Sequence, residues 1–425
     1  FKNEIISFKD ANQRSNSMAH FLNHLGLKDQ DGLGIMMPNC PEFLYAFYAT
    51  QKLSMYSVPI NTALIGDGLK HIIEDSEIKA LVIDQKHLHA FLAIQEKLKR
   101  TIILIVKDSI DDSHTSLDNY IEFSTEKNNI WKFNPSNKSS ILYTSGTTGL
   151  PKGVVLKYNS QIIRRLGLIN NLIYNKNDIL FTCLPLFHVN ALYLSFSASL
   201  WLGIPIVLEK KFSAGRFWEQ INKRKATVVN TIGAMIPILL KTHSEAKNSI
   251  RLVLSAACPA ESWKEFEKRF KVTIWECYSA VDGGQNYIFN MGNAPVGSIG
   301  RISKSKFKII NDLGEDCDPT VPGELCFKIS SNKQPLEYYK NEQASKSKIK
   351  NGYLHTGDLV YKDKKGFLYF VGRKTESIRR KGENISAYEV EQAIQSHPKV
   401  LECAVYGVPS DLAEEEIMTS IVMLS

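Results

Sequence analysis

Closely spaced cysteines are missing from this chain of 425 residues. Its seven cysteines are scattered, and no two of them have the spacing of a zinc site. Because disulfides are rare in reducing compartments, an odd number of scattered cysteines favours reduced thiols and a cytoplasmic protein. A signal peptide is not visible either, but the chain begins at Phe1 without a methionine. We therefore expect a fragment and leave a lost targeting segment open.

Long hydrophobic runs are also missing. The most apolar stretch, 191–208, is interrupted by serines, Gly203 and Pro205, and it only reaches the short limit for a membrane span. We expect a strand that ends at Pro185, a buried helix that starts at His188, a turn at 203–205 and a strand over 206–208. No basic run is interleaved with aromatic residues, which argues against a nucleic-acid groove.

The chain is long enough for more than one hydrophobic core. Helical spacing of apolar residues predicts helices over 7–25 and 42–52, and apolar runs predict strands at 33–37, 79–83 and 101–106. Nearly continuous apolar runs are typical of parallel strands that are covered on both faces. Strands that alternate with helices predict an α/β fold with a largely parallel sheet.

A glycine-rich stretch with several hydroxyl groups follows the apolar run 140–142. It extends from Tyr143 to Gly153 and reads Tyr-Thr-Ser-Gly-Thr-Thr-Gly-Leu-Pro-Lys-Gly. Glycines let backbone N–H groups approach an anion, and Lys152 supplies a positive charge for phosphate. The spacing is not that of the Walker motif. A hairpin loop with a solvated lysine is the alternative, but the residue types favour a loop that holds a polyphosphate.

As an ordered string, this stretch closely resembles the phosphate loop of the acyl-adenylate-forming enzymes, which include acyl- and aryl-CoA ligases, peptide-synthetase adenylation domains and firefly luciferase. Further motifs follow in the order of this superfamily. They are a small-residue turn at 256–259, a tyrosine motif at 278–282, the string Leu-His-Thr-Gly-Asp at 354–358 and a charged segment from 372. The resemblance therefore extends over essentially the whole chain.

The resemblance implies roles for individual residues. Lys152 would neutralise phosphate, Asp358 would bind both ribose hydroxyls, and His188 would lie beside the carboxylate pocket. Magnesium would be held by Thr144 and Asp282. The remaining residues implied in binding ATP and CoA are Ser145, Gly146, Thr147, Thr148, Gly149, Ala257, Cys258, Pro259, Cys277, Tyr278, Ser279, Arg373, Lys381, Gly382 and Glu383.

The tyrosine motif departs from the family pattern Tyr-Gly-x-Thr-Glu. Ser279 replaces the glycine, Val281 replaces the threonine, and Asp282 stands where glutamate is expected. Aspartate is a competent oxygen ligand for magnesium but is one methylene shorter, and valine offers no hydrogen bond to phosphate. A strand end without any ligand is the alternative interpretation of this segment.

One missing carboxylate narrows the range of acids that could be the substrate. Amino-acid-activating members of the superfamily carry an aspartate near the pocket, whereas this chain has no carboxylate between Phe181 and Trp201. A buried ammonium without a counter-charge is costly, which argues against an α-amino acid. The segment 211–234 looks most like the branch of carnitine-CoA ligases and fatty-acid transport proteins.

We therefore expect an AMP-forming acyl-CoA synthetase that uses ATP, Mg²⁺ and CoA and activates an aliphatic or fatty carboxylic acid through acyl-AMP. A ligase that loads a carrier protein and a catalytically weak nucleotide-binding relative are the alternatives. No nucleic-acid partner is expected, and the oligomeric state and peripheral membrane association stay open.

The implied architecture has unequal domains. A large N-terminal domain of the adenylate-forming type, built of several subdomains, would cover residues 1–371, and a hinge would follow at 372–378. Residues 379–425 would begin a small α+β C-terminal domain. We expect this domain to be truncated, because the family usually carries a lysine beyond the point at which this chain ends.

Overall fold

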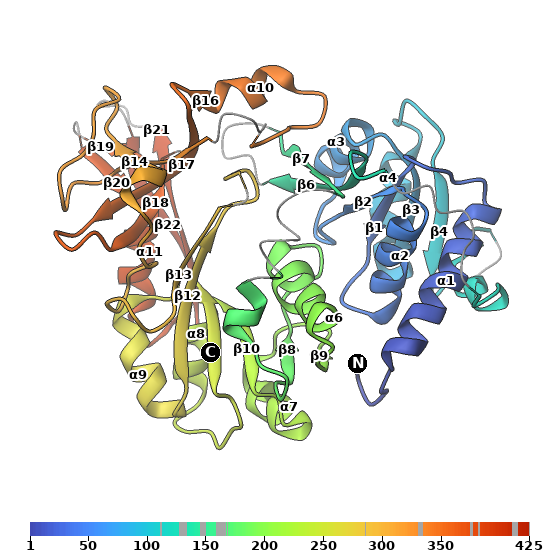
Figure 1. Cartoon of the computed structure of the whole chain (residues 1–425), viewed down its shortest axis with the longest axis horizontal. Helices are drawn as coiled ribbons and strands as arrows, with labels where there is room; N and C mark the ends of the chain where they lie inside the picture. The colour runs from blue at the N-terminus through green and yellow to red at the C-terminus, as the bar shows by residue number, and fades with distance from the viewer. Residues whose placement is uncertain are drawn as a thin grey trace. The chain divides into compact units, whose positions relative to one another are not determined.

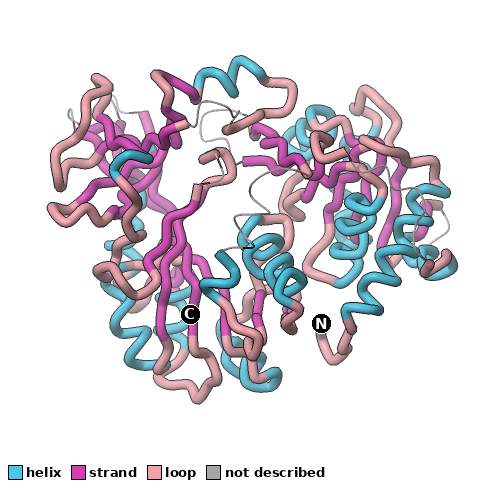
Figure 2. The backbone as a smooth tube through the Cα atoms, in the orientation of Figure 1, coloured by secondary structure: helices cyan, strands magenta, loops and turns pink. Residues whose placement is uncertain are grey.

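The computed structural model describes residues 1–110, 113–126, 134–144, 150–158, 167, 169–284, 286–329, 335–374, 377–380, 383–409 and 415–424. The chain forms two compact units. The first comprises Phe1–Phe212 with Leu336–Glu342, and the second comprises Ser213–Pro335 with Gln343–Ser425. Strands and helices occur in both units (Figure 1; Figure 2).

The first unit is built on a seven-stranded sheet with the order β5-β4-β3-β1-β2-β6-β7. Its neighbouring strands are parallel except for β7, which is antiparallel to β6. The predicted parallel α/β sheet is thereby confirmed. The strands are β1 (Gly32–Met36), β2 (Tyr56–Pro59), β3 (Ile78–Asp84), β4 (Ile103–Lys107), β5 (Thr115–Ser116), β6 (Lys138–Thr144) and β7 (Lys152–Lys157), and the helical segments are α1 (Phe8–His24), α2 (Pro41–Lys52), α3 (Gly66–Asp75), η1 (Gln85–His87), α4 (Leu88–Gln95) and η2 (Leu117–Glu122).

Apolar side chains fix these helices on the sheet. Leu69 and Ile73 of α3 and Phe91 of α4 share one buried cluster with Ile83 of β3 and Val106 of β4. The helices α1 and α2, which the sequence predicted, pack against each other. Burial of apolar surface of this kind is the main favourable contribution to folding.

The apolar stretch at 191–208 folds as predicted into helix, turn and strand. A π-helix, η3 (Asn190–Ser197), continues into α6 (Ala198–Leu202), and β9 (Ile206–Leu208) pairs in parallel with β8 (Leu180–Thr182). Gly203 ends α6 with φ of 66°, a left-handed conformation that suits glycine. Among the described residues, no helix combines the length and the apolar character that a bilayer crossing requires.

Two expected boundaries in this region are wrong. β8 ends at Thr182 rather than at Pro185, and the helical segment begins after His188 rather than at it. The backbone N–H of His188 donates a hydrogen bond of 3.0 Å to the carbonyl of Pro185 and closes a turn there. A proline has no N–H for a strand ladder, so the turn takes its place.

The second unit begins with a run of parallel strands. β10, β11 and β12 are parallel neighbours, and β13 is antiparallel to β12. The helix α8 packs against α9, and α9 also packs against β12 (Figure 1). The elements are η4 (Ala214–Arg216), α7 (Phe217–Arg224), β10 (Val228–Ile232), α8 (Met235–Thr242), β11 (Leu252–Ala256), α9 (Ala260–Phe270), β12 (Thr273–Ser279) and β13 (Tyr287–Asn290).

An antiparallel sheet follows in the second unit. Its pairs are β14 with β15, β15 with β17, β16 with β17 and β17 with β18. Ile309, Leu325, Val360 and Leu368 of this sheet share a buried cluster with Tyr278 at the end of β12. The elements are η5 (Lys304–Lys306), β14 (Phe307–Ile310), β15 (Gly323–Lys328), α10 (Glu342–Ser347), β16 (Ile349–Lys350), β17 (Tyr353–Lys362) and β18 (Leu368–Arg373).

The last part of the chain is a small α+β arrangement. Helix α11 packs against β18 and β21, and a small cluster joins Ile378, Ala387 and Val405. The β19–β20 and β21–β22 pairs are antiparallel hairpins. The elements are β19 (Ser377–Arg380), β20 (Glu383–Ser386), α11 (Ala387–Gln395), β21 (Val400–Pro409) and β22 (Glu415–Met423).

Candidate functional site

The glycine-rich stretch joins the antiparallel strands β6 and β7. Thr144 lies opposite Lys152, and the Thr144 hydroxyl donates a hydrogen bond of 3.4 Å to the Lys152 carbonyl. The Lys152 side chain is exposed, and its Nζ lies 5.6 Å from the centre of the Tyr338 ring. The ammonium is therefore near an aromatic face and accessible to an anion. The predicted residues Ser145, Gly146, Thr147, Thr148 and Gly149 lie outside the described residues.

Side chains of α3 hold both ends of this stretch. The Tyr143 hydroxyl donates a hydrogen bond of 2.6 Å to Oδ2 of Asp75, and His71 Nε2 lies 2.8 Å from the Pro151 carbonyl. Because a carbonyl only accepts, His71 must carry its proton on Nε2. A Cβ at Gly153 would lie 2.6 Å from a β6 side chain, so the close pairing of the strands needs glycine there. The sequence analysis selected neither His71 nor Asp75.

Three of the predicted nucleotide-binding residues, which lie on three different strands, come together. The Tyr278 hydroxyl of β12 donates a hydrogen bond of 2.5 Å to Oδ2 of Asp358 in β17. Arg373 of β18 is the cross-strand neighbour of Asp358, and its Nε lies 3.1 Å from Oδ1. Asp358 is only 2% exposed. Tyr278 and Arg373 lie 80 and 15 residues from Asp358 in the sequence, and both contact its carboxylate.

Burial governs the protonation of this group. Burial raises the pKa of Asp358, and the guanidinium of Arg373 is the main opposing influence. Burial also raises the pKa of Tyr278 well above its usual value, with Asp358 reinforcing the shift. The phenol therefore stays a donor, and each carboxylate oxygen keeps lone pairs that can accept a further hydroxyl. Such a carboxylate can bind a vicinal diol.

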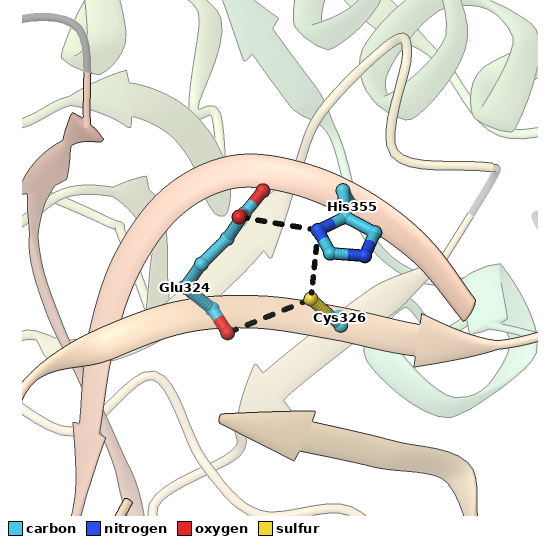
Figure 3. A group of neighbouring side chains, drawn as sticks. All are labelled: Glu324, Cys326 and His355. Carbon is cyan, nitrogen blue, oxygen red and sulfur yellow. Dashed lines mark hydrogen bonds and ion pairs between the residues drawn. The ribbon is translucent and has the colours of Figure 1, made fainter. Parts of the chain in front are cut away.

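Beside the Thr-Gly-Asp segment of β17, where the pairing with β15 shifts register, Glu324 and Cys326 of β15 face His355 of β17 (Figure 3). Oε2 of Glu324 lies 3.2 Å from Nδ1 of His355, and Oε1 accepts a hydrogen bond of 3.0 Å from the N–H of Gly357. Cys326 Sγ lies 3.5 Å from the same His355 nitrogen. The group thus holds the β17 backbone at Gly357, next to Asp358.

A metal ion is one conceivable occupant of this cluster, because the three donor atoms lie within 4.8 Å of one another. A neighbouring cation argues against it, because the ammonium of Lys374 lies 3.9 Å from Glu324 and would repel a metal ion there. The hydrogen bonds of the cluster reach the β17 backbone at Gly357. We therefore interpret the cluster as hydrogen-bonded support for this part of β17.

A buried carboxylate that the sequence analysis did not select holds the small-residue turn. Glu276 is 2% exposed and accepts hydrogen bonds from the N–H groups of Ala257 and Cys258, the latter at 3.1 Å. Ala257 has φ of 62°, which is unfavourable for a residue with a side chain. A Cβ at Gly233 would lie 1.9 Å from the Ala257 carbonyl oxygen. Glu276 and Gly233 together fix the turn that contains Pro259.

The electrostatics of Glu276 are unusual. Burial raises the pKa of Glu276 to about 8, and the two N–H donors oppose this shift. Burial also raises the thiol pKa values of Cys258 and Cys277 above their usual range. Protonated thiols are poor nucleophiles, so these two cysteines act as small apolar walls. All seven cysteines lie in the described part of the chain and are free.

The two polar departures in the tyrosine motif have local partners. Ser279 donates a hydrogen bond of 3.0 Å to the carbonyl of Asn286. Asp282 is 5% exposed, and its Oδ2 lies 2.5 Å from Nζ of Lys348. Oxygen donors such as Thr144 and Asp282 suit magnesium chemically, but at Asp282 an ammonium already occupies one oxygen. Lys348 was not predicted as a site residue.

The last predicted residues are only partly described. His188 is exposed in the turn before η3, and its ring packs edge-on against Phe187 at a centroid distance of 4.7 Å. Lys381, Gly382 and the side chain of Glu383 lie outside the part that the structure describes. Their expected role in binding ATP and CoA stays a prediction.

Known protein families match most of this chain. Residues 1–333 match the family model described as AMP-binding enzyme, and 389–425 match AMP-binding enzyme C-terminal domain. A crotonobetaine/carnitine–CoA ligase of Escherichia coli is 29% identical, over 98% of this chain and 83% of the relative. The o-succinylbenzoate CoA synthetase of Bacillus subtilis with its acyl-adenylate intermediate has a TM-score of 0.83 at 26% identity, over 100% of this chain and 85% of that one.

A second structure of the Bacillus subtilis synthetase contains ATP and a magnesium ion. It has a TM-score of 0.81 at 26% identity and covers 99% of this chain and 86% of that one. The mixed α/β fold with a large N-terminal and a small C-terminal domain is therefore shown for this chain.

Proposed function

Because the chain belongs to the AMP-binding enzyme family and is an acid–CoA ligase of that family, we propose that it converts an aliphatic carboxylic acid into its CoA thioester. The observation that carries the proposal is the convergence of Tyr278, Asp358 and Arg373. These residues were selected by three separate motifs, and they meet around one buried carboxylate.

The reaction has two steps. In the first, an oxygen of the substrate carboxylate attacks the α-phosphorus of ATP, the bond to pyrophosphate breaks, and acyl-AMP forms. In the second, the thiol of CoA loses its proton to solvent and attacks the acyl carbon. The bond to AMP then breaks, and AMP leaves with the electron pair. The attacking carboxylate is already charged, so the protein mainly has to position the reactants and neutralise phosphate charge.

Each site residue has a proposed part in these steps. Lys152 places an accessible ammonium at the phosphates, and Asp358 accepts hydrogen bonds from the two ribose hydroxyls. The ring of Tyr278 stacks on adenine while its hydroxyl orients Asp358. Magnesium, when bound with ATP, supplies further positive charge, and Thr144 and Asp282 are the residues that would hold it.

An aliphatic acid is favoured by the segment after His188. No carboxylate occurs between Phe181 and Trp201, and Ala191, Leu192 and Leu194 are buried in η3. An apolar helix without a counter-charge suits an uncharged acyl chain better than an ammonium. Transfer to a carrier protein and a weakly active relative remain the alternative functions.

The free thiols and the C-terminal segment support two smaller proposals. Seven free cysteines agree with a reducing compartment such as the cytoplasm. We also propose residues 372–378 as a hinge between a domain at 1–371 and the segment 379–425. The β18 strand ends at Arg373, within this hinge.

The proposal is tested by incubating the protein with ATP, magnesium and a panel of acids, with and without CoA. The panel contains short, medium and long aliphatic acids, an aromatic acid and crotonobetaine. We expect sustained AMP release with an aliphatic acid only when CoA is present, and a large loss of this release in Asp358→Ala. AMP release that depends on a carrier protein would instead support the first alternative. Nucleotide binding without turnover for every acid would contradict the ligase function.

A further inference from the structure

The side chain of Lys348 reaches into the candidate nucleotide site from outside every family motif. Lys348 follows α10, and its backbone is tied to β17 because the N–H of His355 donates to the Lys348 carbonyl at 2.8 Å. Its Nζ lies 2.5 Å from Oδ2 of Asp282 and donates to the Thr356 carbonyl at 3.2 Å. The ammonium is therefore held by two oxygens on a fixed backbone.

The pair is largely withdrawn from water. The Lys348 side chain is 23% exposed and that of Asp282 is 7% exposed. An ion pair in such surroundings is screened less by salt than a surface pair. Asp282 also raises the pKa of Asp358 and Lys348 lowers it, after the larger effects of burial, Arg373 and the Tyr278 hydrogen bond. The carboxylates of Asp282 and Asp358 and the cations that pair with them, Lys348 and Arg373, are thus electrostatically coupled.

An ammonium and a divalent cation compete for the same carboxylate. The oxygen of Asp282 that faces Lys348 cannot accept a metal ion until the ammonium moves away, since two cations at one oxygen repel each other. An incoming triphosphate, in contrast, brings negative charge that could accept the displaced ammonium. A metal ion that arrives with the nucleotide can therefore reach Asp282 more easily than a metal ion that arrives alone.

We propose that Lys348 is the resident counter-ion of Asp282 in the nucleotide-free protein, where it suppresses binding of divalent cations to that carboxylate. The metal then enters with the nucleotide rather than before it. The inference rests on the proposed function, because that function assigns Asp282 to the metal-bearing nucleotide. Lys348 is thereby a positioning residue that sets when Asp282 becomes available.

The test measures Mn²⁺ binding to the nucleotide-free protein by electron paramagnetic resonance. Lys348→Met removes the ammonium, and Lys348→Gln removes the charge but keeps a hydrogen-bond donor for the Asp282 and Thr356 oxygens. Both variants should bind Mn²⁺ at least about tenfold more tightly than the wild type, since a charge-assisted hydrogen bond no longer has to break. Lys348→Arg and Lys350→Met, a change at an exposed lysine on the adjacent β16 strand, should resemble the wild type.

A second substitution identifies the residue at which the Lys348 variants bind Mn²⁺ more tightly. Adding Asp282→Asn to Lys348→Gln should abolish the tighter Mn²⁺ binding. Unchanged Mn²⁺ affinity in both Lys348→Met and Lys348→Gln, with wild-type thermal midpoints, would overturn the proposal, and so would a gain that survives Asp282→Asn. The measurement uses neither acid nor CoA, so a failed ligase assay and a failed counter-ion proposal are distinguishable.

Discussion

Replacing Glu276 by glutamine should change how the stability of the protein depends on pH. In the folded protein, burial raises the pKa of Glu276 from 4.5 to about 8, so the folded state binds a proton that the unfolded state releases. The stabilisation from this proton is fully present below about pH 4.5 and is lost as the pH rises through about 8. At about 1.4 kcal/mol per pKa unit, the difference between the two pKa values corresponds to about 5 kcal/mol of unfolding free energy.

Glutamine cannot titrate and has a single side-chain oxygen, so it satisfies only one of the two N–H groups of Ala257 and Cys258. The unpaired N–H should lower the free energy of unfolding by about 1–3 kcal/mol at pH 5. Between pH 5 and pH 8.5 the wild type should lose stability that Glu276→Gln keeps. The difference in unfolding free energy between the wild type and Glu276→Gln should therefore disappear or change sign.

The assay is urea unfolding followed by tryptophan fluorescence at pH 5, 7 and 8.5. The matched control is Glu261→Gln, which changes an exposed glutamate on α9. The control should follow the wild-type pH profile. Parallel profiles for the wild type and Glu276→Gln would refute the reasoning, because they would show that Glu276 does not change its protonation on folding.

Three further substitutions test other parts of the site and its support. Asp358→Ala should weaken AMP binding by about tenfold or more, because it removes a charged acceptor of ribose hydroxyls, and unchanged affinity by calorimetry would sink that assignment. Lys152→Ala should slow pyrophosphate release at saturating ATP while AMP affinity changes little, and a wild-type rate would speak against its phosphate role. Lys241 donates to the carbonyls of Gln395, His397 and Val400 at 2.6, 3.0 and 2.7 Å, at and beyond the end of α11. Lys241→Met should therefore speed amide hydrogen exchange over 395–400, whereas equal exchange would mean that the contacts do not anchor this end.

The parallel sheet was predictable because its strands are short apolar runs separated by amphipathic segments, and β1, β3 and β4 lie where the runs predicted them. Boundaries near Pro185 and His188 were wrong by a few residues, since a turn hydrogen bond between these residues decided them. The π-helix at 190–197 was not predictable, because its apolar pattern is also compatible with an α-helix.

Within the site, local motifs identified Tyr278 and Asp358 separately, and the structure joins them by a hydrogen bond that the motifs did not predict. The supporting residues were missed for two different reasons. Glu276 had a signal, namely an acid inside the apolar strand 274–278, that was not used. Lys348 had none, because its partner Asp282 lies 66 residues away and only the tertiary fold brings the charges together.

The central claim is that this chain joins a carboxylic acid to CoA through an acyl-adenylate. It is tested most directly with an acid whose carboxyl group carries ¹⁸O, incubated with ATP, magnesium and CoA and analysed by mass spectrometry. We predict one ¹⁸O atom in each AMP released and one acyl-CoA formed for each AMP, because the attacking oxygen stays on the phosphate. Acyl-CoA formed together with unlabelled AMP, or with ADP and labelled inorganic phosphate, would contradict the account.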